Sequence, residues 1–224
     1  MNVLLKEPKQ QAQACVIWMH GLGADAQDMM GLANELPLHA PVRHVFLNAP
    51  VRPVTLNNRM PMRAWYDILG MQLTDREDRV GIEQSEQLIR EAIAVQCANG
   101  LASHQIFLAG FSQGGAMALH VGIHTESPLA GVIALSAYLP LSDQCQVVQD
   151  RHTPFFLAGG LYDPMVLPAW TTLTVNHLRQ QGFDTLVFHE YPMEHSICKE
   201  EVADLAHWID KQVTALGSHQ RGAL

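Results

Sequence analysis

Cysteines and basic residues are scarce in this sequence, and each scarcity excludes a class of function. The chain has four cysteines, at positions 15, 97, 145 and 198, and no two of them show the two-residue separation typical of zinc and redox motifs. Its 14 basic residues against 22 acids give a formal net charge of -8, and they form no patch that could neutralise several phosphates. We therefore expect free thiols and no nucleic-acid partner.

Long apolar runs are absent as well. The residues from Met1 to Pro8 become charged too early for a secretory signal, and no run approaches the length of a membrane span. The two-histidine zinc motif that could begin at His189-Glu190 fails, because Met193 stands where the second histidine belongs. These absences predict a cytoplasmic protein without stable membrane insertion and without a bound metal.

Two patterns alternate along the chain, whose 224 residues suit one domain spanning 1–224. Short apolar runs, typical of strands buried on both faces, lie at residues 14–19, 45–47, 105–109, 131–135, 154–158 and 185–191. Amphipathic stretches typical of helices lie at residues 27–36, 82–98, 113–124, 169–181 and 197–216, and the second should end at Asn99-Gly100. The alternation predicts the α/β class: one doubly wound, mostly parallel sheet flanked by helices, with ligand sites on the loops at the carboxyl ends of the strands.

A candidate nucleophile lies between one of these strands and the next helix. In Gly110-Phe111-Ser112-Gln113-Gly114, two glycines flank a serine at the spacing of a nucleophile elbow. Such a turn exposes the serine oxygen but brings the residues two before and two after it into contact, where only glycine fits. The helix that begins at Gln113 would also aim its free amides at a developing oxyanion. An ordinary glycine-rich turn is the alternative interpretation.

The acid and the base of a triad follow the serine in that order along such folds. Asp163 comes after the strand expected at 154–158 and a Gly-Gly turn; the alternatives are Glu194 as the acid, or a plain helix cap at Asp163. Of the eight histidines beyond Ser112, only His195 lies in the loop between the last strand and the last helix. We therefore expect Ser112 as nucleophile, His195 as base and Asp163 as the residue that orients the base. Cys198, close after His195, is a further candidate for the wall of the site.

Two backbone amides are expected to hold the oxyanion. One belongs to Gln113, directly after the nucleophile, and the other to Leu22, in a loop where Gly21 and Gly23 let an amide face inward. The same loop resembles the start of a dinucleotide fingerprint, but position 26 lacks the third glycine and no acid ends a following strand. A Rossmann site is therefore not expected.

The chain resembles the acyl-protein thioesterase and small carboxylesterase/lysophospholipase family of α/β hydrolases over nearly its whole length. The segments that carry the resemblance are His20-Gly21-Leu22-Gly23 with Asp28, Asn48-Ala49-Pro50, Pro53-Val54-Thr55, Trp65-Tyr66-Asp67-Ile68, Gly110 to Gly115, Leu135-Ser136, Asp163-Pro164 and His195-Ser196. The resemblance implies a compact α/β-hydrolase fold without a large lid, and the same triad and oxyanion amides. One departure is Gly159-Gly160-Leu161 in place of the family's usual His-Gly-Asp, which implies altered polarity near the acid.

The irregular segment at residues 50–73 carries an unusual number of apolar side chains. A loop of this composition is expected to cover either the flank of the core or an apolar ligand. Under the resemblance it borders an acyl-chain groove, to which Trp65, Ile68, Leu69, Met71 and Leu73 would contribute contacts. A strip around Met71 and Leu73 can equally support a homodimer.

Together these residues predict a serine hydrolase that cleaves carboxylic esters or thioesters of small molecules or acylated proteins through an acyl-enzyme, with no cofactor. A lysophospholipase, a peptidase of the same fold and a non-catalytic acyl-binding protein are the alternatives. The peptidase is disfavoured because such enzymes usually add a domain that screens substrates, for which 224 residues leave no room.

Overall fold

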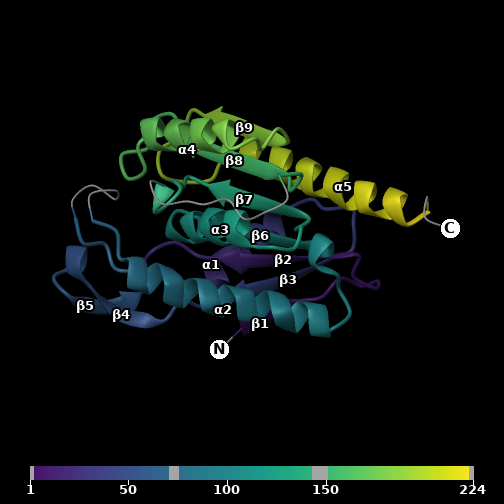
Figure 1. Cartoon of the computed structure of the whole chain (residues 1–224), viewed down its shortest axis with the longest axis horizontal. Coiled ribbons are helices and arrows are strands. Elements are labelled where there is room, and N and C mark those ends of the chain that lie inside the picture. Colours follow the sequence, from purple (N-terminus) through teal and green to yellow (C-terminus); the bar gives the residue numbers. More distant parts are fainter. Residues whose placement is uncertain (1–2, 71–75, 143–150, 222–224) are drawn as a thin grey trace.

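The centre of the molecule is a seven-stranded sheet in the computed structural model, which describes residues 3–70, 76–142 and 151–221 (Figure 1). Its strands lie in the order β1-β3-β2-β6-β7-β8-β9, where β1 runs antiparallel to β3 and the other neighbouring pairs are parallel. Their bounds are β1 (Val3–Lys6), β2 (Ala14–Met19), β3 (Val42–Leu47), β6 (Ile106–Phe111), β7 (Gly131–Leu135), β8 (Phe155–Gly160) and β9 (Leu186–Tyr191). The predicted doubly wound, mostly parallel sheet is confirmed.

Helices cover both faces of the sheet. One face carries α1 (Ala26–Glu35) and α5 (Lys199–Arg221), and the other carries α2 (Arg79–Ala98), α3 (Gln113–His124) and α4 (Pro168–Gln180). Alternate residues of β2 point to the two sides: Ile17 and Met19 join the core beneath α2, α3 and α4, whereas Val16 and Trp18 join the core beneath α1 and α5. All four are fully buried, as the continuous apolar run predicted.

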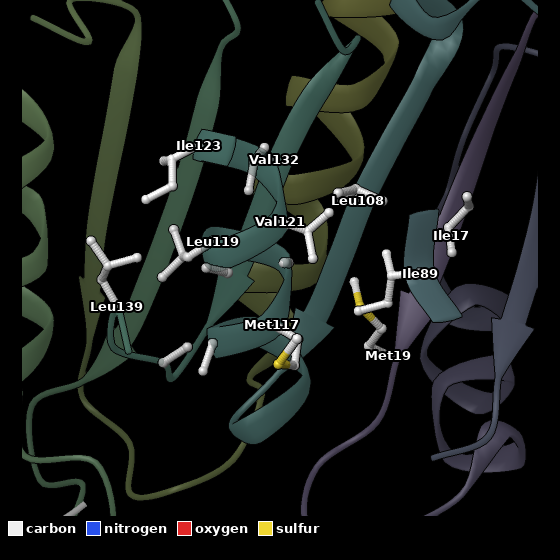
Figure 2. Close-up of a cluster of buried hydrophobic side chains, with 14 of the residues drawn as sticks. Ile17, Met19, Ile89, Leu108, Met117, Leu119, Val121, Ile123, Val132 and Leu139 are labelled. Carbon is white, nitrogen blue, oxygen red and sulfur yellow. The ribbon is translucent and has the colours of Figure 1, made fainter. Parts of the chain in front are cut away.

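The core between the sheet and the α2–α3–α4 layer is closely packed (Figure 2). Figure 2 shows side chains of α2 and α3, among them Ile89 and Val121, directed toward Leu108 and Val132 of the sheet. Gly122 of α3 makes the approach close, since a Cβ built there would lie 2.5 Å from a Val132 methyl group. Burial of this apolar surface is the main force that holds the helix layer on the sheet.

The second helix shows how local sequence signals set an element's ends. Asp78 caps α2, because its Oδ1 accepts a hydrogen bond from the Gly81 amide at 3.0 Å. The helix therefore begins at Arg79, before the start that the apolar stripe predicted. At its other end Gly100 has φ +96°, so the predicted left-handed residue after the helix is confirmed.

The segment at residues 50–73 is more regular than expected in its first half. It forms a hairpin of β4 (Val51–Val54) and β5 (Met60–Arg63), joined through a short 3-10 turn at Thr55–Asn57. Asp67 ties the following residues to this hairpin, because its carboxylate accepts hydrogen bonds from both the amide and the hydroxyl of Thr55, at 2.7 and 2.6 Å. The short β1 strand was also not predicted.

The strand order brings four loops to one edge of the sheet. The chain moves outward from β2 to β3 and then returns to β6 on the other side of β2, so loops diverge between β2 and β6. Met19 pairs with Gly110 across these two strands, which sets the loop after β2 beside Ser112. Loops after β8 and β9 end at the same edge. Within the described part of the chain, no helix has the length and apolarity to cross a bilayer.

Candidate active site

Ser112 occupies a strained turn between β6 and α3. Its φ of 53° and ψ of -120° lie in a region that L-residues rarely adopt. A Cβ on Gly110 would lie 2.2 Å from the Gly114 carbonyl carbon, and one on Gly114 would lie 2.1 Å from the Met19 oxygen. The predicted contact between the residues two before and two after the serine is therefore confirmed, and neither position has room for a side chain.

The loop after β2 is held by a neutral histidine. His20 donates from Nδ1 to the Gly21 oxygen at 2.7 Å, and its Nε2 accepts from the Ala49 amide at 3.0 Å. Burial lowers the pKa of His20, which favours the neutral ring that this pair of bonds requires. The Trp65 indole donates to the His20 oxygen at 2.9 Å, and Gly23 supplies the positive φ of 76° that turns the chain. Leu22 is thus held between fixed neighbours.

Gln113 contributes a side chain that sequence reasoning did not use. Its amide oxygen accepts from the Trp65 backbone at 2.8 Å, and its amide nitrogen donates to the Tyr66 oxygen at 2.8 Å. These two bonds join the start of α3 to the segment that follows the β4–β5 hairpin. The only signal in the sequence was the glutamine directly after the nucleophile. The sequence does not show that its side chain contacts the backbone of Trp65 and Tyr66.

His195 and Asp163 form the contact that the triad hypothesis requires. His195 Nδ1 donates to Asp163 Oδ2 at 2.7 Å, and the carboxylate side chain is only 1% exposed. The other carboxylate oxygen accepts from the amides of Met165 and Val166 at 2.8 and 2.9 Å. Because the carboxylate accepts the hydrogen bond from Nδ1–H and so keeps the proton on Nδ1, the Nε2 lone pair of the neutral ring is left to face another group.

The loops that carry the acid and the histidine are fastened to each other. A Cβ on Gly160 would lie 2.4 Å from the Met193 oxygen, so the two loops touch at backbone level. The amide of Tyr162 donates to the same Met193 oxygen at 3.1 Å. Leu161, the departure from the family pattern, is 45% exposed, so an apolar side chain faces solvent beside the acid. Glu194, the alternative acid, has an exposed side chain.

Ser112 and His195 line one cavity of about 880 Å³, together with Leu22 and Gln113. The imidazole lies against Phe111, the residue before the serine, with 4.8 Å between ring centroids. Among the described residues, no hydrogen bond joins the Ser112 hydroxyl to the imidazole. The structure therefore brings the predicted serine, base, acid and amide donors to one place.

Residues that line the cavity belong to the cores on both faces of the sheet, and we refer to these two sides of the cavity as its arms. The first, which we call the acyl arm because the resemblance predicts the acyl-chain groove here, lies on the side of α2, α3 and α4 and is lined by Tyr66, Ile68, Tyr138 and Val166. The α1/α5 arm is lined by Met29, Leu32, Pro37, Val202 and Ala203. Cys198 also lines the cavity on the α1/α5 side, and burial raises the pKa of its thiol.

Only part of the expected acyl-chain wall lies in the cavity. Ile68 lines it, but Trp65 does not, because this fully buried indole is turned toward the His20 oxygen. Leu69 is 42% exposed and also lies outside the wall, while Met71 and Leu73 fall outside the described residues. Contacts of Trp65 and Leu69 with a substrate therefore stay a prediction that the lining of the cavity does not support.

Two tyrosines were missed by sequence reasoning. The hydroxyl groups of Tyr66 and Tyr138 lie 3.0 Å apart in the acyl arm, and burial raises the pKa of both. Their hydroxyl groups are polar groups in the lining of this arm. The segment Trp65-Tyr66-Asp67 drew attention to Tyr66, but nothing in the sequence indicated Tyr138.

Comparison with known proteins agrees with this geometry. The family model for Phospholipase/Carboxylesterase matches residues 2–213. Acyl-protein thioesterase 1 of Mycosarcoma maydis is 36% identical, over 90% of this chain and 92% of its own, and that of Emericella nidulans is 35% identical, over 90% and 91%. The solved structure of Arabidopsis thaliana SOBER1 has a TM-score of 0.83 at 26% identity, covering 89% of this chain and 99% of that one. The chain belongs to the phospholipase/carboxylesterase family and is a hydrolase of carboxylic esters or thioesters.

Proposed function

We propose that this protein hydrolyses acyl thioesters, with S-acylated proteins as its substrates, through a covalent acyl-enzyme on Ser112. The two curated relatives that align with nine-tenths of the chain bear the name acyl-protein thioesterase 1. The apolar wall of the acyl arm supports an aliphatic acyl group, since ligand pockets bind chiefly through such surfaces.

The observation that carries the proposal is the 2.7 Å bond between His195 and Asp163 at the edge where Ser112 stands on its strained turn. The carboxylate holds the imidazole with Nε2 unprotonated, ready to take the serine proton. As that proton moves to Nε2, Ser112 Oγ bonds to the acyl carbon and the carbonyl electron pair moves onto its oxygen. The amides of Leu22 and Gln113 stabilise this oxyanion.

Collapse of the tetrahedral intermediate breaks the bond from carbon to sulfur, and the proton on His195 Nε2 goes to the leaving thiolate. Water then repeats the sequence on the acyl-enzyme, with His195 as base, and releases the fatty acid. A hydrogen bond between Ser112 and His195 that forms only with substrate is compatible with this cycle, because such bonds often tighten on binding.

Substitution of the serine is the direct test. In Ser112→Ala, we expect kcat for an S-octanoyl thioester to fall at least about ten-thousandfold, because only the oxyanion donors and binding remain. Labelling by a fluorophosphonate should be lost as well, since that reagent needs an activated serine. Ser196→Ala is the matched control, because Ser196 lines the same cavity beside the histidine. Labelling that survives Ser112→Ala and disappears in Ser196→Ala would overturn the assignment.

The same reagents separate the rival functions. A non-catalytic acyl-binding protein would bind an octanoyl probe without labelling, and a peptidase would cleave the matching amide at a rate comparable to the thioester. A lysophospholipase would prefer the lysophospholipid over a thioester of equal acyl length. Cytoplasmic location and a homodimer remain predictions of the sequence, which cell fractionation and light scattering test.

A further inference from the structure

The α1/α5 arm is the part of the cavity that the proposed acyl chain does not use. It continues past Ser112 to the opposite face of the sheet, between the start of α5 and the length of α1. Met29 is buried in its wall, and Leu32 and Val202 are half-buried. Asp28, Glu35 and Lys199 are exposed along its rim, so charges of both signs surround an apolar interior.

His195 stands on the same side of Ser112 as this arm. It precedes α5 directly, and its ring packs on Phe111, whose side chain belongs to the core beneath α1 and α5. Ile197 and Cys198, which follow it, pack into that core as well. The residues of the acyl arm, in contrast, join the core on the other face.

Acyl-transfer chemistry then decides which part of the substrate enters which arm. The imidazole must give its proton to the leaving atom, so the leaving group has to lie on the histidine side of the acyl carbon. The acyl chain leaves the carbon in another direction, because the oxyanion faces the amides of Leu22 and Gln113. With His195 on the α1/α5 side, the acyl chain enters the acyl arm and the leaving group enters the other.

We propose that the α1/α5 arm binds the leaving group, and that it takes the apolar residues flanking the acylated cysteine of a peptide. The proposal rests on the proposed function and adds the substrate's second half to it. A phosphate-bearing headgroup fits this arm poorly, because its interior is apolar and its rim carries Asp28 and Glu35 against the one cation Lys199 among the lining residues. Apolar flanking residues match the wall.

Two peptides with the same acyl group separate the arms. Each carries an S-octanoyl cysteine, one in Ac-Gly-Cys-Gly-NH2 and the other in Ac-Leu-Cys-Leu-NH2. We expect kcat/KM of the wild-type protein to be about tenfold higher for the leucine peptide, as partial burial of an aliphatic side chain predicts. Equal kcat/KM values would overturn the leaving-group site. If neither peptide is hydrolysed, the proposed function itself fails.

A substitution that fills the arm should remove this preference. Ala203 is exposed on α5 and lines the cavity, so Ala203→Phe adds a ring in the arm without disturbing the core. We expect kcat/KM for the leucine peptide to fall at least about tenfold while that for the glycine peptide stays within about twofold. Val202→Ala, which removes contacts from the wall of the arm, should also reduce the preference for the leucine peptide over the glycine peptide.

His207→Phe is the matched control. It places the same ring on the same helix, one turn further along, at an exposed residue outside the cavity wall. Both peptides should be hydrolysed by this variant as by the wild-type protein. A loss in Ala203→Phe that is equal for the two peptides, or that also appears in His207→Phe, contradicts the proposal.

Discussion

The two sides of the candidate active site are built by different means. Ser112 is positioned by backbone alone: its turn works because Gly110 and Gly114 have no side chains and because α3 is buried against the sheet. His195 is positioned by a side chain, the carboxylate of Asp163, and its own side chain is 20% exposed. The position of the serine therefore depends on close backbone packing, whereas the orientation of the imidazole depends on its hydrogen bond to Asp163. Substitutions should separate the two.

The largest effect is expected on the histidine side. Asp163→Asn keeps the size of the side chain but offers an amide in place of a charge, so the imidazole is no longer held with its proton on Nδ1. We expect kcat to fall roughly ten-thousandfold, the loss that a wrong histidine tautomer causes in other triads. Hydrolysis of a p-nitrophenyl ester measures it.

Glu194→Gln is the control for that variant, because Glu194 is the other acid near the histidine and its side chain is exposed. It should retain kcat within about threefold, since surface substitutions rarely act on chemistry. If the two variants exchange these outcomes, Asp163 does not orient the base. Expressed as a free energy, the change in the thermal stability of Asp163→Asn should be far smaller than its loss of activity.

The serine side should respond in the opposite way, through stability. In Gly114→Ala the new methyl group would meet the Met19 oxygen at 2.1 Å, which only a shift of β2 or α3 can relieve. We expect a loss of about 4 kcal/mol or more in the free energy of unfolding, the range of severe core strain. Urea denaturation measures it, and the variant is expected to lose activity because Ser112 moves.

Gly31→Ala is the matched control within a helix. A Cβ at Gly31 of α1 meets nothing within 4 Å, so the substitution should stabilise the protein by about 0.5–1 kcal/mol through helix propensity. Equal effects of the two glycine substitutions would show that close packing behind Ser112 is not what fixes the turn.

This difference also explains what could be predicted from the sequence. The serine turn follows from local pattern, because Gly110, Ser112 and Gly114 carry the strand, the bend and the helix start within five residues. Asp163 and His195 required only the order of elements, since each follows a strand at the same sheet edge. Local periodicity and a fixed strand direction therefore suffice for the fold and the triad candidates.

The walls of the site could not be predicted in the same way. Trp65 and Tyr66 are neighbours in sequence, yet one is turned toward the His20 oxygen and the other lines the acyl arm. Their directions depend on Gln113, which holds the backbone of both residues from another element. The α1/α5 arm could not be predicted, because the sequence pattern places Leu32 and Val202 on the apolar faces of amphipathic helices, as it does core residues. Such walls arise from contacts between distant segments.

The smallest expected effect tests whether the histidine side also carries a cost in stability. Glu201, in the first turn of α5, is 0% exposed, and neither carboxylate oxygen has a hydrogen-bond partner within normal limits. Burial raises the pKa of this carboxyl to about 8 from 4.5. A raised pKa means that the folded state holds the proton more tightly than the unfolded chain does. The buried carboxyl therefore costs no stability below pH 4.5, where it is protonated in both states. The free energy of unfolding falls increasingly as the pH rises toward 8.

Glu201→Gln removes the charge and with it the pH dependence, while any cost of the buried amide is the same at every pH. We expect the stability of the variant relative to wild type to rise by about 3 kcal/mol between pH 5.5 and pH 9, or roughly 6–12 °C in Tm. Glu200→Gln, at the exposed neighbouring residue, should show no such trend. A Tm difference that is flat with pH would mean that Glu201 is charged in the folded protein at no cost in stability. The histidine side would then carry no pH-dependent cost in the free energy of unfolding.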